Sequence, residues 1–205
     1  MPRIDDYISA RKIAIETLSE QALIDISGRS GFELLDENCL RVPFLNRVFR
    51  VHFPDFEFSD HTDADIEVPI QEQILILHYM LAPQTHPLTG QWVAYREIPG
   101  ASFYFSAFVK RAIDPLKNVF GQNPTGLSQA AALLDGRSIE AGDVGFEFDV
   151  LPNVPLQLIL YAADEEFSAE ANILFDRTIG EILSPEDIAW LAGMLVYRLI
   201  VFSKS

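Results

Sequence analysis

The chain has 205 residues, of which 49% are hydrophobic, so it is long enough to bury a sizeable core and too apolar to be disordered over most of its length. Thirty acidic residues against 15 basic ones give a formal net charge of −15, which repels nucleic-acid backbones and anionic membranes. The single cysteine, Cys39, excludes an internal disulfide and an all-cysteine metal site. We therefore expect neither a nucleic acid nor a membrane as partner.

The N-terminal residues 1–7 are polar and lack the basic and then apolar pattern of a signal peptide. The longest uncharged run near the C-terminus, residues 188–197, is too short to span a bilayer, which needs about 20 residues. Both observations favour a cytoplasmic protein. Cys39 is interpreted as an inert thiol at the start of a strand, because nothing nearby in sequence offers a base to activate it.

Apolar periodicity predicts a first helix over about residues 5–19, and the glycines at 28–31 predict a turn. Short extended segments separated by turn residues then favour an antiparallel meander over residues 32–35, 40–44 and 47–53. The acidic residues 59–67 are expected to form a loop. A helix is predicted to open near Pro69 and to end before Pro83.

The second half of the chain begins with a mixed stretch, residues 91–102. A helix is expected over 102–113, restarted by Asp114 and Pro115, and a short one over 127–134. Residues 144–151 alternate apolar and polar side chains and, with residues 156–162 and 171–175, predict a second meander. Ser184 and Pro185 are typical of the start of a last, mostly apolar helix.

These elements predict one α+β domain over residues 1–205. Its antiparallel sheet is built from the two meanders, with helices packed on its faces. No repeat, low-complexity tract or Gly/Ser-rich linker interrupts the chain, and residues 83–90 are the best candidate for a boundary.

The strongest candidate for a binding site is the segment around a Pro-Gly turn that leads into a predicted helix. Trp92, Tyr95, Arg96 and Tyr104 concentrate aromatic rings and one guanidinium there. Aromatic and arginine side chains on loops favour binding, and a helix N-terminus favours anions. These residues are predicted to hold a small anionic ligand. The alternative is a packed loop in which Arg96 pairs with one of the many acids.

Two acidic clusters suggest a different chemistry. Asp63, Asp65 and Glu67 alternate in a way that could ligate a metal, and a hairpin could bring Asp164 close to Asp176 as an acid–base pair. The simpler interpretation of both clusters is a solvated loop. Motifs of phosphate loops, dinucleotide-binding folds, nucleophile elbows and zincin helices are absent from the sequence. No catalytic residue or metal ligand is assigned.

Three stretches, residues 92–100 (WVAYREIPG), 151–160 (LPNVPLQLIL) and 164–176, together resemble a domain-of-unknown-function family found largely in anaerobic bacteria and archaea. Some members of that family carry an iron–sulfur cysteine module like that of corrinoid iron–sulfur proteins. Cys39 alone cannot hold such a cluster. The resemblance implies a setting in anaerobic one-carbon or tetrapyrrole-linked metabolism, and no activity.

Three functions remain open at this point. The first is a binding module for a small anionic ligand or cofactor, for which a tetrapyrrole is one candidate. The second is a carboxylate-based enzyme, with or without a metal. The third is an adaptor that docks on a partner enzyme through an apolar patch.

Overall fold

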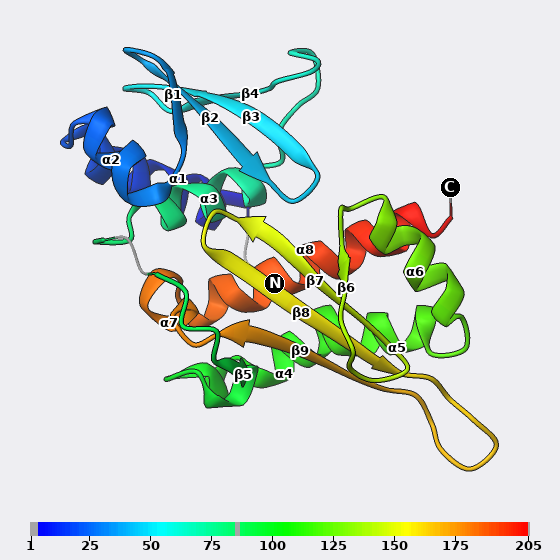
Figure 1. Cartoon of the computed structure of the whole chain (residues 1–205). Coiled ribbons are helices and arrows are strands. Elements are labelled where there is room, and N and C mark those ends of the chain that lie inside the picture. Colours follow the sequence, from blue (N-terminus) through cyan, green and yellow to red (C-terminus); the bar gives the residue numbers. More distant parts are fainter. Residues whose placement is uncertain (1–3, 85–86, 205) are drawn as a thin grey trace. The chain divides into compact units, whose positions relative to one another are not determined.

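The structure, a computed structural model, describes residues 4–84 and 87–204 (Figure 1). The chain divides into two compact units. The first comprises Met1–Pro87 with Glu181–Leu183, and the second comprises Leu88–Gly180 with Ser184–Ser205. Each unit has its own antiparallel sheet and its own helices.

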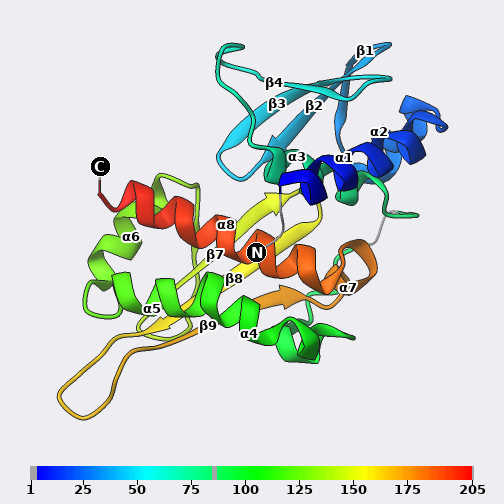
Figure 2. The same cartoon turned by 180° about the vertical axis from the view of Figure 1, so that it is seen from behind.

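The first unit contains a four-stranded sheet in the order β1-β2-β3-β4, with helices on one side of it (Figures 1 and 2). Its elements are α1 (Ile4–Ser19), α2 (Leu23–Ser30), β1 (Glu33–Asp36), β2 (Cys39–Phe44), β3 (Arg47–His52), β4 (Glu57–Asp60) and α3 (Ile70–Met80). Val42 lies opposite Phe49 and Leu40 opposite Val51. All four side chains are buried. They lie on the same face of the sheet, because residues two positions apart along a strand point to the same side.

An ion pair links β3 to the end of β4. The guanidinium Nε of Arg47 donates to the buried carboxylate of Asp60 at 2.9 Å, and the Thr62 hydroxyl donates to the other oxygen at 2.6 Å. The hydrogen bond from Thr62 is the main cause that lowers the pKa of Asp60 to about 2, and the Arg47 contacts add to it against the opposing effect of burial. Asp60 is therefore a structural anion that ends the strand.

The second unit contains a five-stranded sheet in the order β5-β9-β8-β7-β6. Its strands are β5 (Trp92–Ala94), β6 (Arg137–Ser138), β7 (Val144–Leu151), β8 (Val154–Tyr161) and β9 (Glu170–Asp176). Its helical segments are η1 (Tyr95–Glu97), η2 (Ala101–Phe103), α4 (Phe105–Phe108), η3 (Val109–Ile113), α5 (Asp114–Phe120), α6 (Pro124–Ala132) and α8 (Pro185–Phe202). A further helix, α7 (Ile179–Ile182), passes from the second unit into residues grouped with the first.

Helices cover one face of this sheet. Figure 2 shows α4, α5 and α8 in front of the strands. The side chains directed to that face are apolar, and on the central strand Leu156, Leu158 and Leu160 are fully buried. The opposite face carries polar groups such as Glu147 and Gln157, which are cross-strand neighbours. The sheet thus has a helix-covered core on one face, while its other face carries polar groups together with the buried Ile159.

The helix over residues 105–120 contains a π-helical turn, η3. Pro115 has no N–H to donate to the carbonyl of Arg111, four residues earlier, so the ordinary helical hydrogen bond is missing there. The N–H of Asp114 instead bonds the carbonyl of Val109. Gly193 of α8 lies against the backbone of Arg111, where an added Cβ would come within 3.3 Å of its carbonyl oxygen. The widened turn therefore packs directly on α8.

The α+β prediction is confirmed, and the two meanders lie in two separate sheets. Several elements were not predicted, among them α2, β4, β5, β6 and α7. Residues 28–30 were expected in a turn but belong to α2, which ends at Gly31 with a φ of 74°. Residues 57–60 form β4, although residues 59–67 were assigned to a loop. The expectation of a single domain stays a prediction. None of the helices in residues 4–84 and 87–204 combines the length and apolar character needed to cross a membrane.

Candidate functional site

The predicted binding segment lies at one edge of the five-stranded sheet. Trp92 belongs to the edge strand β5 and lies opposite Asp176 of β9. The chain then forms η1, turns at Gly100 with a φ of 79°, and forms η2 before α4 begins at Phe105. The helix that was expected to start near Ser102 therefore starts three residues later. The segment consists of short turns held on the edge of a rigid sheet.

Tyr95 is part of the core. Its side chain is 1% exposed, and its ring is stacked on that of Phe108 with a centroid distance of 4.2 Å and an interplanar angle of 2°. The hydroxyl donates to the backbone carbonyl of Pro185 at 2.7 Å. Burial is the main cause that raises the pKa of Tyr95 to about 12. Tyr95 therefore joins η1 to α8 and does not present its hydroxyl to a ligand.

Arg96 has the opposite environment. It is exposed, and its guanidinium lies over the ring of Phe105 at 3.7 Å from the centroid. Glu97, the acid next to it in sequence, accepts a hydrogen bond from the N–H of Ala94 at 2.7 Å. Within the part of the chain that the structure describes, no acid pairs with Arg96. Stacking fixes the plane of the guanidinium and leaves its N–H groups at the surface.

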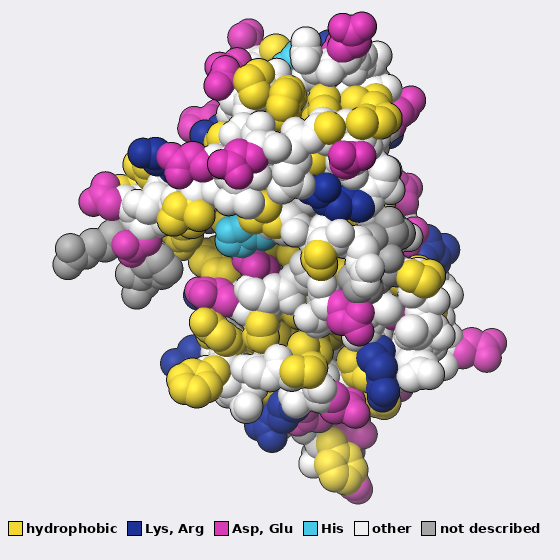
Figure 3. Space-filling view, turned by 90° about the vertical axis from the view of Figure 1, so that its left-hand side faces the viewer, with side chains coloured by type: hydrophobic (Ala, Val, Ile, Leu, Met, Phe, Trp, Pro, Cys, Tyr) yellow, Lys and Arg dark blue, Asp and Glu magenta, His cyan; other side chains and the backbone are white. Residues whose placement is uncertain are grey.

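The remaining aromatic residues surround this position in sequence. Trp92 and Tyr104 are half-buried, and Phe103 is 95% exposed. Figure 3 shows, in the lower part of the view, hydrophobic side chains lying between Lys and Arg side chains. Sequence reasoning missed Phe103 and Phe105, because a phenylalanine is normally assigned to the core.

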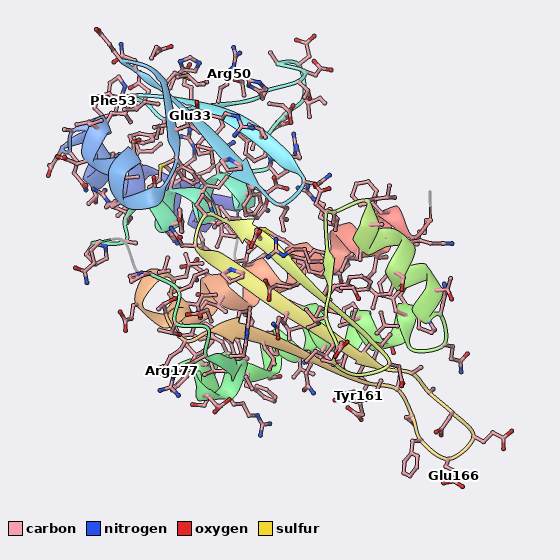
Figure 4. The ribbon with its side chains drawn as sticks, in the orientation of Figure 1. Glu33, Arg50, Phe53, Tyr161, Glu166 and Arg177 are labelled. Atoms are coloured by element: carbon pink, nitrogen blue, oxygen red, sulfur yellow. The ribbon has the colours of Figure 1, made fainter. Side chains whose placement is uncertain are left out.

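A second arginine, Arg177, lies at the same edge of the sheet. It follows β9 directly, and its N–H bonds the carbonyl of Gln91, which precedes β5, at 2.9 Å. Figure 4 shows the labelled Arg177 at the end of the sheet where β5 lies. Its side chain is exposed. No pattern in the sequence pointed to Arg177, because 82 residues lie between it and Ala94, the last residue of β5.

Asp176 holds this edge together. Its carboxylate is 2% exposed and accepts hydrogen bonds from the N–H and hydroxyl of Thr89, the N–H of Gly90, and the N–H and hydroxyl of Thr178. Burial opposes ionisation, but the hydrogen bonds from Thr178 and Thr89 together outweigh it, and the pKa of Asp176 is lowered. Asp176 is a structural anion that fixes the chain on both sides of the β5–β9 pair.

The proposed pairing of Asp164 with Asp176 is wrong. Asp164 lies in the loop that joins β8 to β9, whereas Asp176 ends β9 and lies opposite Trp92. Nearly the whole length of β9, a strand of seven residues that ends at Asp176, separates the two carboxylates, which corresponds to about 20 Å of extended chain. The spacing in sequence is that of a hairpin loop plus a strand, and it was mistaken for that of a short hairpin.

The acidic residues 61–67 do not assemble a metal site. Among the described residues, no group of three or more His, Cys, Asp and Glu side chains is arranged to hold a metal ion. Asp63 accepts a hydrogen bond from the N–H of Asp65 at 3.0 Å, as is typical of a turn. Cys39 starts β2, is buried, and has a raised pKa mainly because of that burial, which is the environment of an inert thiol.

Two hollows of about 440 Å³ each lie elsewhere. One is formed by Ser128 of α6 and by residues 138–146, and the other by α1 together with Asp55 and Ile70. Neither includes residues 92–104. Because Arg96 and Phe103 are exposed and Trp92 and Tyr104 are half-buried, the binding segment offers a platform at the surface, and such a platform suits a ligand that keeps one side in solvent.

Comparison with known proteins yields one match. The family model described as "Domain of unknown function (DUF3786)" matches residues 23–198. A search of curated proteins found no match, and a search of solved structures found none. The matched range includes the whole binding segment, residues 92–104, and most of both units.

Proposed function

Because the chain belongs to the DUF3786 family, whose description assigns no function, we propose from the geometry that it is a binding module for a small anionic ligand or cofactor. The ligand lies on the platform formed by Trp92, Arg96, Phe103, Tyr104 and Phe105. Tyr95 supports the platform from within the core and makes no contact with the ligand.

This proposal rests on the environment of the Arg96 guanidinium, which is exposed and stacked on an aromatic ring. The protein has twice as many acidic as basic residues, so an exposed arginine would be expected to find an acid. The guanidinium of Arg96 instead stacks on the ring of Phe105, while the carboxylate of the neighbouring Glu97 accepts a hydrogen bond from the backbone N–H of Ala94. A guanidinium whose plane is already fixed loses little conformational freedom on binding and presents a planar array of donors to a carboxylate or phosphate.

The aromatic surroundings favour a ligand with a flat apolar part. Phe103 is almost fully exposed, and Trp92 and Tyr104 are half-buried near it in sequence. Exposed aromatic side chains next to arginine are typical of binding sites. A tetrapyrrole bearing carboxylates combines an apolar plane with anionic groups, and we propose it as the first class of cofactor to test.

The test is titration with three named probes: haem, hydroxocobalamin and citrate. Binding is followed by calorimetry and by the shift in melting temperature. Arg96→Ala is expected to lower the affinity for the bound probe at least ten-fold. Arg96→Lys is expected to lower it less, because lysine keeps the charge but loses the planar array of donors. Arg137→Ala is the matched control, since Arg137 is also an exposed arginine but is already paired with acids.

Two results would contradict the proposal. One is the absence of binding by all three probes. The other is a probe that binds Arg96→Ala as tightly as it binds the wild-type protein.

A further inference from the structure

The connection between β8 and β9, residues 162–169, projects from the second unit as a long hairpin loop (Figures 1 and 2). Figure 4 shows the labelled Glu166 at its tip and the labelled Tyr161 at its base. Phe167, next to Glu166, is 69% exposed. An aromatic side chain directed into solvent at the tip of a projecting loop contributes nothing to the core.

The base of this loop is fixed to the body of the second unit. The N–H of Ala163 bonds the carbonyl of Gly121 at 2.8 Å, and the N–H of Ala162 bonds the carboxylate of Asp143 at 2.8 Å. Ala169 packs so closely on Gly121 that an added Cβ on the glycine would lie 2.5 Å from the Cβ of Ala169. The loop is therefore held at both ends.

The tip is also ordered. The carboxylate of Asp164 accepts hydrogen bonds from the N–H groups of Glu166 and Phe167 at 2.8 and 2.7 Å. The N–H of Asp164 donates to the carbonyl of Phe167 at 3.0 Å. These contacts close a small turn around residues 164–167, and this turn holds the backbone of Phe167 in place. An aromatic residue whose backbone is already held can be buried by a partner at a lower entropic cost than one on a disordered loop.

We propose that residues 162–169 form a docking finger that inserts Phe167 into an apolar pocket with a basic rim on a partner protein. Asp164, Glu165 and Glu166 directly precede Phe167, and the finger contains no Lys or Arg. The net charge of −15 has the same sign, so both the local and the total charge attract a positively charged surface. The finger lies outside the Arg96 platform, and its role does not depend on the ligand bound there.

The same charges disfavour two other occupants. Anionic lipid headgroups are repelled by three consecutive carboxylates, although Phe167 alone would suit a membrane interface. A second copy of this chain carries the same net negative charge, so long-range attraction is lacking. Both are distinguished from a basic partner protein by the experiment below.

The experiment places a photo-crosslinker beside the aromatic residue and leaves Phe167 intact. Ser168→p-benzoylphenylalanine is produced in the cells that natively make the protein, and Ser102→p-benzoylphenylalanine, beside the exposed Phe103, is the matched control. Both serines are exposed. After irradiation, the crosslinked peptide is sequenced by mass spectrometry. We expect one protein adduct from position 168, mapped to a segment with Lys or Arg around apolar residues, and no such adduct from position 102.

Two further variants test the chemistry of the contact. Phe167→Ser is expected to lower the adduct yield at least ten-fold, and so is Glu165→Lys with Glu166→Lys. Glu37→Lys with Glu140→Lys changes the net charge equally at exposed sites outside the finger and is expected to leave the yield unchanged. The proposal is overturned by the absence of an adduct, by an adduct to lipid, to a second copy of the chain or to an acidic surface, or by equal effects of the two charge reversals.

Discussion

Arg137 and Arg96 are exposed arginines at opposite edges of the five-stranded sheet, and they are used differently. On the β6 edge, Arg137 lies opposite Glu147 and forms ion pairs with Glu147 and Asp149. The hydrogen bonds that Arg137 donates to the carboxylates of Asp149 and Glu147 raise the pKa of Arg137 further. On the β5 edge, Arg96 stacks on Phe105 and has no acid partner within the described chain.

The difference shows how an acidic protein can keep one cation available. At the β6 edge, cross-strand neighbours supply the acids that pair with Arg137. At the β5 edge, the nearby acids are engaged by backbone donors: Glu97 by Ala94, and Asp176 by Thr89, Gly90 and Thr178. Their hydrogen bonds fix them in place. The charge of Arg96 therefore stays available because the acids of the whole β5 edge are held by other donors, and substitutions along that edge test this.

The largest effect is expected from Asp176→Ala. The substitution leaves the donors of Thr89, Gly90 and Thr178 without their acceptor, and removing one partner of such a buried network costs about 3 kcal/mol in the free energy of unfolding. Urea denaturation measures the loss. Asp149→Ala on the opposite edge is the control, with an expected loss of less than about 1 kcal/mol because that side chain is exposed. Equal losses in the two variants would contradict the assigned role of Asp176.

The same carboxylate makes stability depend on pH. Because the pKa of Asp176 is lowered in the folded protein, its contribution is fully present above the ordinary aspartate pKa and is lost as the pH falls below it. Asp60, with a folded pKa of about 2, acts in the same direction. Unfolding curves at pH 7 and pH 3 are expected to show a smaller pH effect in Asp176→Ala than in the wild-type protein.

The next effect is expected from Tyr95→Phe. Loss of the hydroxyl leaves the carbonyl of Pro185 without its donor and costs about 1 kcal/mol, while the ring stack on Phe108 remains. Probe binding at Arg96 should stay at the wild-type level, because Tyr95 is buried. A loss of affinity with unchanged stability would show that Tyr95 contacts the ligand after all. Tyr161→Phe, at an exposed tyrosine, is the stability control.

The raised pKa of Tyr95 also predicts that the folded protein loses stability at alkaline pH. Its pKa is about 12 in the folded protein against an ordinary value of about 10. The folded state therefore holds its phenolic proton longer than the unfolded state, and the resulting stability is present below pH 10 and lost between about pH 10 and 12. Tyr95→Phe should show a weaker decline over that range.

Local sequence signals predicted the parts of the fold that local physics decides. Residues 144–151 alternate strictly and form β7 with the predicted bounds, and Ser184 caps α8 by accepting the N–H of Asp187. The helix α2 was missed because Ser27, Gly28 and Ser30 are typical of turns. In the structure, the Ser30 hydroxyl bonds the carbonyl of Ile26, and only Gly31, with its positive φ, ends the helix.

The site was predictable as a segment but not residue by residue. Tyr95 and Arg96 are neighbours with the same loop signature, yet one is buried against Phe108 and the other is exposed. The choice depends on Phe108 of α4 and Pro185 of α8, which lie 13 and 90 residues further along the chain. The position of Arg177 at this edge of the sheet depends likewise on the pairing of β9 with β5. Such long-range contacts leave no periodic trace in the sequence.

A smaller effect is expected from Arg137→Ala. It breaks the ion pairs with Glu147 and Asp149 at a partly exposed position, so the loss of stability is expected to be about 0.5 kcal/mol and to shrink in high salt. Affinity for the anionic probe should not fall. A loss of affinity comparable to that of Arg96→Ala would erase the contrast between the two edges.

The smallest effect is expected from Glu97→Gln, and it tests the sign of the charge that the platform binds. The amide oxygen can still accept the hydrogen bond from Ala94, so stability should be nearly unchanged, while one negative charge beside Arg96 is removed. Two charges about 8 Å apart in water interact by about 0.5 kcal/mol, so affinity for an anion should rise about two-fold. Calorimetry at low salt resolves this change, with Glu165→Gln as the control at a distant acid. A fall in affinity would mean that the platform of Arg96 and its aromatic neighbours binds a cation, and the contrast between the two edges would then need another explanation.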